Sequence, residues 1–360
     1  MILTEKLDNL HYSFREIDGY NKPINIVISP REPGKTSMFW LNKIYIPFLR
    51  DRNPWIYLVR QGVEISEPML TSILDTILNK FTDDDNKFIY TKNEMRTGIM
   101  DIYLINKHIA TKTLFFRIVS LNIMMKRIKQ AALKKCAGVL MDEFIIDPST
   151  GEKYLQNEYF KIKEAYTTWR REASGVLKMY FLGNPYSLFN PLFVGLGVDT
   201  KKMKRDSFYV GDEYVIHWAI LSEGLKKKLL ELNPFYRFDE DYTKYALEGQ
   251  AVKDSNIKTG KQPIGFQLYL SIRMGGKYIG IFTDTTYENE FAYFCKFVDK
   301  VAADRITYCF EFEEMVERTV IMSLDERSRL MRFKTAMRQG KVLFEDINVY
   351  YFILEVYKNI

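Results

Sequence analysis

Apolar runs in the first half of the chain alternate with segments that repeat apolar positions every three or four residues. The runs are rich in β-branched and aromatic residues and are bounded by proline, glycine or polar residues, which predicts buried strands at 24–28, 55–60, 113–120, 138–141 and 177–182. The periodic segments predict helices at 38–49, 67–80, 123–135 and 159–172. Residues 88–90 and 100–106 resemble an antiparallel hairpin. Alternation of strands and helices indicates an α/β fold with a parallel, doubly wound sheet.

The pattern changes after about residue 200. A basic stretch at 201–205 precedes a strand-like segment at 208–217 and a helical one at 222–232. Strands then come before helices: a hairpin of 263–274 and 277–284, a strand at 306–312, and helices at 324–339 and 344–357. We therefore predict three parts: an α/β domain (1–200), a basic, partly helical linker (201–232) and an α+β domain (233–360).

Composition narrows the class of protein. Of the 360 residues, 47% are apolar, which is enough for two hydrophobic cores. The sequence contains no run of eighteen apolar residues, so it predicts no membrane-spanning helix. The three cysteines, Cys136, Cys295 and Cys309, fit a reducing cytoplasm better than a zinc site or a disulfide framework. The net charge of +6 permits a polyanionic partner without requiring one.

A short loop follows the first predicted strand and carries the first candidate chemistry. It runs from Ser29 through Arg31 to Gly34-Lys35-Thr36 and Ser37, where a helix can begin. Strand, tight loop and helix with Gly-Lys-Thr at the junction are typical of a phosphate-binding loop, in which backbone N–H groups hold an anion. Lys35 would then reach the β- and γ-phosphates of ATP, and the Thr36 hydroxyl would hold Mg²⁺. An ordinary strand–turn–helix junction is the alternative, because the pattern has glycine where this chain has Ser29.

A second signature follows the run at 138–141. That buried strand ends in Asp142-Glu143. Asp142 could hold Mg²⁺ through water, and Glu143 could polarise a water for attack on the γ-phosphate. Two acids that merely end a strand are the alternative. Together with Gly34-Lys35-Thr36, the pair favours ATP hydrolysis.

Three further polar residues are candidates for the same reaction. Asn184 ends the strand at 177–182 and could orient the attacking water, or it could be a turn residue before Pro185. Arg170, with Arg171 as the alternative, lies on the preceding helix and could stabilise a neighbouring subunit's phosphate, or form a surface ion pair. Arg31 could act within its own chain or face solvent.

These motifs together resemble one family, the DNA encapsidation proteins, which are the prohead-RNA-dependent packaging ATPases of small tailed podophages. The resemblance rests on Asn25-Ile-Val-Ile before the Gly34-Lys35 loop, on Val139-Leu-Met-Asp142-Glu143-Phe144, and on Leu182-Gly-Asn184 with Asn190-Pro191. It continues in 245–255 and in the last helices, so it covers nearly the whole chain.

The resemblance implies a P-loop ATPase domain of the ASCE, RecA-like type, followed by an RNase H-like domain without nuclease activity. It implies a pentameric ring that uses ATP and Mg²⁺ to move double-stranded DNA into a procapsid, in contact with prohead RNA and the portal (connector), in the host cytoplasm and transiently on the prohead. Arg170 falls on the family's trans-acting arginine, if a small length difference is allowed, and Lys126 falls on its trans-acting lysine. Ser29 replaces the first loop glycine.

Two other functions compete with this interpretation. A large terminase would need a working two-metal nuclease, for which Asp284, Glu311, Glu313 and Glu314 supply carboxylates by residue type. A small-molecule kinase would share the phosphate-binding loop, but it does not need a glutamate that activates water. In the packaging motor, basic loops would hold DNA phosphates, and Lys126 or the loop at residues 60–68 is the candidate.

Overall fold

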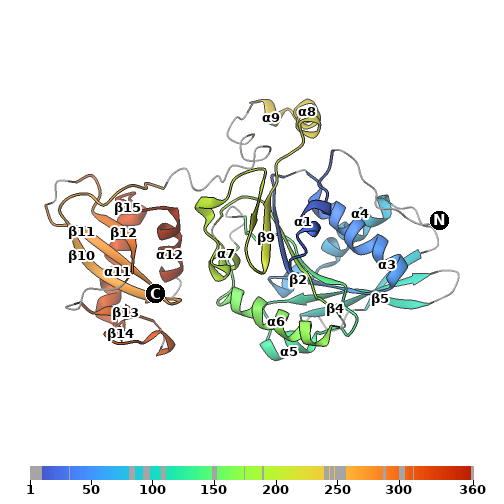
Figure 1. Cartoon of the computed structure of the whole chain (residues 1–360), viewed down its shortest axis with the longest axis horizontal. Coiled ribbons are helices and arrows are strands. Elements are labelled where there is room, and N and C mark those ends of the chain that lie inside the picture. Colours follow the sequence, from blue (N-terminus) through green and yellow to red (C-terminus); the bar gives the residue numbers. More distant parts are fainter. Residues whose placement is uncertain are drawn as a thin grey trace. The chain divides into compact units, whose positions relative to one another are not determined.

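The computed structural model describes residues 10–360 except 32, 81–85, 92–97, 107–110, 148–151, 174, 189, 239–242, 244–246, 248–256, 287–288, 300–304, 311 and 358–360. The chain divides into two compact units, Met1–Val252 and Lys253–Ile360 (Figure 1). The boundary predicted at residue 200 is therefore wrong, because the first unit extends through the segment expected to be a linker.

A nine-stranded sheet forms the centre of the first unit. Its strands are β1 Ile24–Ile28, β2 Trp55–Val59, β3 Asn86–Thr91, β4 Ile99–Asn106, β5 Lys112–Ser120, β6 Gly138–Met141, β7 Met179–Gly183, β8 Ser207–Val210 and β9 Tyr214–Trp218. They lie in the order β3-β4-β5-β2-β6-β7-β1-β9-β8. The predicted strands are confirmed, with one difference: 208–217 is a hairpin, since Gly211 and its neighbours turn the chain between β8 and β9.

The middle of this sheet is parallel and its edges are antiparallel. Strands β5, β2, β6, β7, β1 and β9 run in one direction, while β3, β4 and β8 pair antiparallel at the two edges. The first residues of the predicted linker thus extend the sheet: β9 pairs directly with β1, from Ile24 opposite Tyr214 to Ile28 opposite Trp218. The basic segment is part of the first unit because its apolar strand residues are needed to cover that edge.

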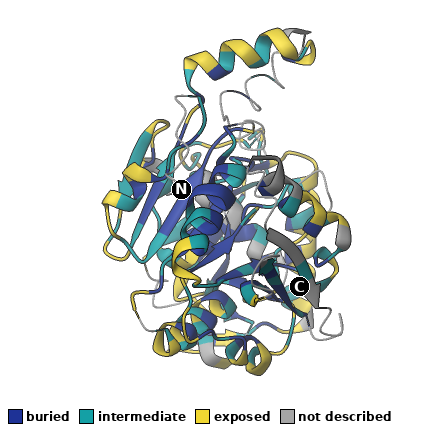
Figure 2. Ribbon diagram, turned by 90° about the vertical axis from the view of Figure 1, so that its right-hand side faces the viewer, coloured by how far each residue is buried: buried dark blue, intermediate teal, exposed yellow. Residues whose placement is uncertain are grey.

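Helices cover both faces of the sheet, as a doubly wound fold requires. One face packs against α1 Arg15–Gly19, the continuous helical segment α2 Lys35–Phe39, η1 Trp40–Tyr45 and α3 Ile46–Asp51, and α4 Glu67–Lys80. The other packs against α5 Met125–Gln130, α6 Glu158–Glu172 and α7 Pro191–Leu196. Short turns η2 Gly62–Glu64 and η4 Thr200–Lys202, and helices α8 Glu223–Leu232 and α9 Phe235–Phe238, complete the unit. In Figure 2 the ribbon is accordingly coloured as buried mainly along the strands of the sheet, and as exposed mainly on the outer helices.

The second unit is an α+β domain around a six-stranded sheet. Its elements are β10 Phe266–Met274, β11 Lys277–Asp284, β12 Tyr293–Val298, β13 Thr307–Cys309, η6 Phe312–Glu314, β14 Thr319–Ile321, α11 Leu324–Arg338, β15 Val342–Phe344 and α12 Ile347–Tyr357. The strand order is β14-β13-β10-β11-β12-β15. An antiparallel β10-β11-β12 meander is flanked on one side by β13 and β14, which run parallel to β10, and on the other by β15, which runs parallel to β12. The predicted α+β class is confirmed.

Within the described part of the chain, every helix is too short or too polar to cross a bilayer. All three cysteines are free thiols.

Candidate functional site

The carboxyl ends of three adjacent parallel strands, β1, β7 and β6, bring the predicted motifs together. Strand β7 lies between the other two, with Ile28 of β1 opposite Gly183 and Met141 of β6 opposite Phe181. The loop after β1, Asn184 after β7 and Asp142 after β6 therefore meet at one edge of the sheet. Ligands of open α/β sheets bind in the crevice outside the carboxyl ends of the strands.

The conformation of the loop after β1 is set by the backbone of Gly34 and by contacts with the segment at residues 10–14. Gly34 has a φ of 69°, which favours glycine, and a Cβ there would lie 2.8 Å from Cδ2 of His11. The Tyr12 N–H donates to the Pro33 carbonyl over 2.9 Å. Helix α2 then begins at Lys35, three residues earlier than the predicted Met38.

The polar groups of Ser29 are bonded to neighbouring carbonyls of its own chain. It is fully buried; its N–H donates to the Gly183 carbonyl over 3.1 Å and its hydroxyl donates to the Pro30 carbonyl over 3.1 Å. Ser29 is also absent from the residues with positive φ, so a side chain is tolerated where the usual pattern has glycine. The departure from the pattern therefore leaves the Gly34–Lys35 corner intact. Ser37 lies in the first turn of α2.

Lys35 is buried and points toward the end of β7. Its Nζ donates to Oδ1 of Asn184 over 2.6 Å. Burial lowers the pKa of Lys35, while the nearby charges of Asp142 and Glu143 raise it and that of Arg31 lowers it. Asn184 is therefore a polar residue of the site itself, and not only a turn residue before Pro185.

Thr36 and Asp142 lie close enough for the Thr36 side chain to affect the pKa of the Asp142 carboxylate. Burial raises the pKa of Asp142, and the Lys35 charge, the Thr36 side chain and the Glu143 N–H oppose that rise. A hydroxyl and a carboxylate side by side are oxygen donors of the kind that Mg²⁺ prefers. The residues present thus fit a magnesium ion at the corner between loop and strand.

Glu143 follows Asp142 in an unusual backbone conformation. Its φ is 54°, and its N–H donates to Oδ1 of Asp142 over 2.9 Å. Its side chain is exposed at the sheet edge. Surrounding protein atoms raise the pKa of Glu143, as do the charges of Asp142 and Glu152, while Lys35 and Arg31 lower it. Non-glycine residues with positive φ cost energy and cluster at functional sites.

Arg31 bridges the loop to the segments that follow β6 and β7. Its Nη2 lies 3.2 Å from Oδ2 of Asp147 and also donates to the Tyr186 hydroxyl. Its charge acts on both Lys35 and Glu143. The loop arginine is therefore directed to its own chain's site.

The structure adds Arg60, which the sequence pattern did not identify as part of the site. It is buried at the end of β2, bonded bidentately to Glu158 over 2.9 and 3.1 Å, and its Nη2 donates to the Phe144 carbonyl over 2.9 Å. This ion pair fixes the residue directly after Glu143. The expectation that the 60–68 loop grips DNA is wrong for Arg60, because a buried, paired guanidinium does not reach an external phosphate.

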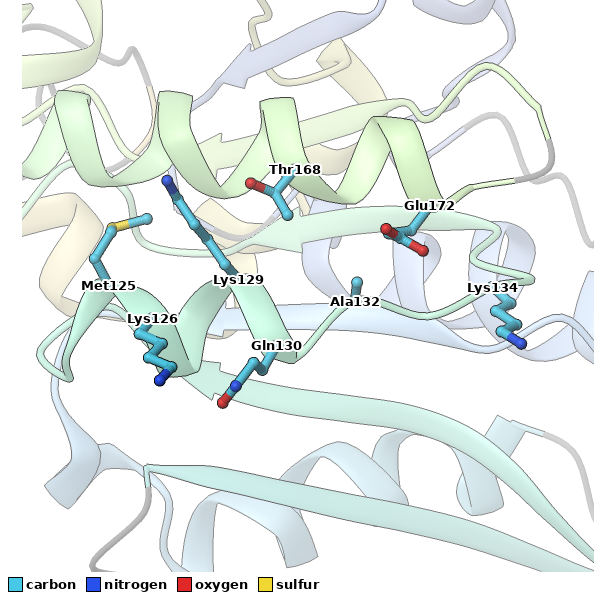
Figure 3. Close-up of a pocket in the computed structure, with 8 residues that line it drawn as sticks. All are labelled: Met125, Lys126, Lys129, Gln130, Ala132, Lys134, Thr168 and Glu172. Atoms are coloured by element: carbon cyan, nitrogen blue, oxygen red, sulfur yellow. The ribbon is translucent and has the colours of Figure 1, made fainter.

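Lys126 lies apart from this corner, in a groove between α5 and α6. The groove has a volume of about 660 Å³ and is lined by Lys126, Lys129, Lys134, Thr168 and Glu172, among others. Figure 3 shows Lys129 extending toward α6, where its Nζ lies 2.6 Å from Oε2 of Glu164, while Lys126 points away from that helix. The predicted helix 123–135 is shorter than expected, and α5 ends at Gln130.

Arg170 and Arg171 are both exposed in the last turn of α6 but leave it on different sides. The charge of Arg171 acts on Glu164, which faces α5, whereas that of Arg170 acts on Tyr166. Because α6 connects the parallel strands β6 and β7, this last turn lies near their amino ends, away from Lys35. Arg170 is therefore not brought to the site of its own chain.

The carboxylates considered for a nuclease have structural roles or lie outside the described residues. Asp284 accepts from the Thr286 N–H over 2.9 Å and the Asn289 N–H over 3.1 Å. Glu314 accepts from Arg273 over 2.6 Å and from the Gly275 N–H over 2.9 Å. Glu311 and the Glu313 side chain lie outside the described residues. No group of three potential metal ligands occurs among the residues that are described.

Comparison with known proteins identifies similar chains. A sequence model of the podovirus DNA encapsidation protein family (Gp16) matches residues 7–360. The match includes 245–255, of which only Leu247 lies among the described residues. No curated protein matches the sequence.

Two solved structures share the fold over nearly the whole length. One is the bacteriophage Phi-29 viral genome packaging motor assembly, 18% identical, with a TM-score of 0.67 over 98% of this chain and 99% of that chain. The other is the Phi-28 gp11 DNA packaging motor, 18% identical, with a TM-score of 0.59 over 96% of each chain. At this identity the likeness establishes the fold.

Proposed function

This chain belongs to the podovirus DNA encapsidation protein family, and from that membership and the site we infer that it is an ATP-driven subunit of a DNA-packaging motor. The single observation that carries the proposal is that the phosphate-binding loop, Asn184 and Asp142 follow three adjacent parallel strands and meet at their carboxyl ends, where Lys35 Nζ donates to Asn184 Oδ1 over 2.6 Å. Glu143 is the residue after Asp142.

The side chains divide the work of hydrolysis among them. The N–H groups of Gly34 and Lys35 and the Lys35 ammonium bind the phosphates. Thr36 and Asp142 would hold Mg²⁺, which would supply positive charge to the phosphates. Glu143 accepts a proton from the attacking water. Asn184 holds Lys35 in place, and Arg31 adds positive charge from the same chain.

Two more residues act between subunits in this proposal. Arg170 is exposed at the end of α6, away from the phosphate-binding loop of its own chain. A residue that stabilises the phosphate of a neighbouring subunit must be exposed in this way. Lys126 is exposed on α5, which packs beside α6, and would also act on a neighbouring subunit. The subunits would form a ring, with a pentamer as the expected size.

The partners follow from the proposed function. Double-stranded DNA would be held by its phosphates, which gives sequence-independent, salt-sensitive binding suited to a translocase. Prohead RNA and the portal would be contacted on the capsid, so that the protein works in the host cytoplasm while attached to the prohead. The second unit would contact nucleic acid without cutting it.

The test is the ATPase rate of the purified protein, with Mg²⁺, with and without double-stranded DNA. We expect DNA to raise the rate and Lys35→Ala to abolish it. Lys22→Ala is the matched control. Lys22 lies before the amino end of β1, whereas Lys35 follows its carboxyl end, and Lys22 donates to the Asp212 carbonyl. A rate that DNA leaves unchanged, with turnover of a small acceptor instead, would identify a kinase and overturn the proposal.

A further inference from the structure

Residues 10–12 cross from the phosphate-binding loop to the start of α8. At the loop, the His11 ring lies against Gly34 and the Tyr12 N–H donates to the Pro33 carbonyl over 2.9 Å. The Tyr12 side chain is buried, and its hydroxyl is hydrogen-bonded to Nδ1 of His217 on β9 over 2.8 Å. The residue that precedes Lys35 is thus held from outside the loop by this segment.

The other end of the segment contacts the amino end of α8. The Ser222 hydroxyl donates to the Leu10 carbonyl over 3.1 Å, and the same oxygen accepts from the Leu225 N–H over 3.3 Å as the helix N-cap. The Leu10 side chain packs beside Gly224, where a Cβ would lie 3.2 Å from Cδ2 of Leu10. One serine therefore caps α8 and ties it to the segment that packs on the loop.

Helix α8 packs along one side only, where Leu225, Leu229 and Leu230 join Leu221, Tyr236 and Leu247 in a small apolar cluster. It lies at the top of the views in Figures 1 and 2, and most of its surface is exposed; Leu225 is its buried residue. In the sequence it follows β9 and precedes the second unit, which begins at Lys253. The Ser222 contact adds to this cluster a polar attachment at the first turn of α8.

We propose that Leu10, His11 and Tyr12 form a strap that couples occupancy of the phosphate-binding loop to the first turn of α8, with Ser222 as the positioning residue at its far end. The coupling has a physical path of contacts: Gly34 to His11, Pro33 to Tyr12, and Leu10 to Ser222. An anion bound to the loop N–H groups biases the Pro33–Gly34 backbone, and the strap transfers that bias to α8. This inference rests on the proposed function, since it requires nucleotide at the loop.

Substitutions at Ser222 separate the strap contact from the helix cap. Ser222→Asp keeps a good N-cap acceptor for the Leu225 N–H but has no hydrogen to donate to the Leu10 carbonyl. Ser222→Thr keeps both functions, and Ser222→Ala loses both. Because the Asp variant retains the cap, a change that it causes is not explained by unwinding of α8.

Hydrogen exchange of backbone amides measures the coupling directly. Each full-length variant is compared with and without Mg²⁺ and a non-hydrolysable ATP analogue, following amides 31–37 in the loop and 223–227 in α8. In the unaltered protein and Ser222→Thr, we expect the analogue to slow exchange in both segments. In Ser222→Asp and Ser222→Ala, we expect slowing in the loop and loss of the nucleotide-dependent slowing in α8.

Two results would overturn the proposal, and they differ from each other. If the loop responds in the unaltered protein while α8 does not, or if Ser222→Asp responds as the unaltered protein does, nucleotide binds but the strap transmits nothing. If neither segment responds in the unaltered protein, nucleotide does not bind at the loop, and both the proposed function and the strap are wrong.

Discussion

Lys35 and Asn184 are 149 residues apart in the sequence, yet Nζ of the lysine lies 2.6 Å from Oδ1 of the amide. The contact follows from the strand order, because β7 separates β1 from β6 and so delivers its terminal residue between the loop and Asp142. An amide is a neutral acceptor. It orients the Lys35 ammonium but leaves its positive charge available to the phosphates. A carboxylate at this position would neutralise that charge.

Asn184→Asp is therefore expected to impair hydrolysis more than Asn184→Ser. The carboxylate would pair with Lys35 and place a negative charge beside the phosphates, whereas serine keeps a neutral acceptor. We expect kcat to fall at least about tenfold for the aspartate variant, equivalent to about 1.4 kcal/mol of transition-state stabilisation. Steady-state ATPase measurements check this. Equal kcat values in the two variants would mean that the charge at this position is irrelevant.

The strands and the two corners of the site were predictable from sequence because each has a local signal. An apolar run ending in Asp142-Glu143 reads as a buried strand with acids at its carboxyl end, whichever fold surrounds it. Gly34-Lys35-Thr36 is likewise recognisable by itself, because Gly34 adopts a positive φ that favours glycine. Features that depend on neighbouring residues in the sequence can therefore be predicted without knowledge of the fold.

Other features depend on contacts that sequence spacing does not encode. Arg60 and Glu158 are 98 residues apart, and nothing near either residue predicts their buried ion pair. Strands β8 and β9 lie in the segment 201–232 that the sequence pattern assigns to a basic linker. Their place in the sheet is decided by pairing with β1, which is a tertiary effect.

Arg170→Ala is expected to leave ATP binding intact and to lower the hydrolysis rate of assembled rings by a factor of about 10³, the lower end for a trans-acting arginine. Arg171→Ala is the matched control, since it removes the same charge from the same exposed turn of α6. Nucleotide affinity, from a fluorescent ATP analogue, and ATPase rate are measured for both variants.

Mixed rings then test whether Arg170 acts between subunits. Subunits with Arg170→Ala retain a complete loop, and those with Lys35→Ala retain the arginine, so mixtures of the two should regain part of the activity when an intact loop meets an intact arginine. If no mixture is more active than the rings made from one variant alone, Arg170 does not act on a neighbouring subunit.

His217 makes stability depend on pH in a defined window. Burial lowers the pKa of His217 to about 4, although Asp206 opposes the shift. Between the ordinary value of about 6.5 and that value, the unfolded chain binds a proton that the folded chain does not, so the free energy of unfolding falls as the pH is lowered through this range. The loss is at most about 3 kcal/mol, and less because the ring is only half-buried.

Denaturant unfolding at several pH values between 7 and 4 measures this loss. His217→Gln is the comparison, since its amide can still accept from Tyr12 but does not titrate. We expect the difference in unfolding free energy between the two proteins to change in favour of the glutamine variant as the pH falls. A pH-independent difference would show that His217 titrates alike in the folded and unfolded chains.

The second unit should not cut DNA, because its best-placed carboxylate is already used. Bonds from Thr286 and Asn289 lower the pKa of Asp284 to about 2, against the effect of its surroundings, which would raise it. Both oxygens hold the turn after β11. We expect no plasmid cleavage with Mn²⁺, and we expect Asp284→Ala to lower the thermal unfolding temperature, with Asp299→Ala, just beyond β12, as the control. Strong cutting that Asp284→Ala abolishes would instead make this aspartate a metal ligand and the protein a nuclease-bearing terminase.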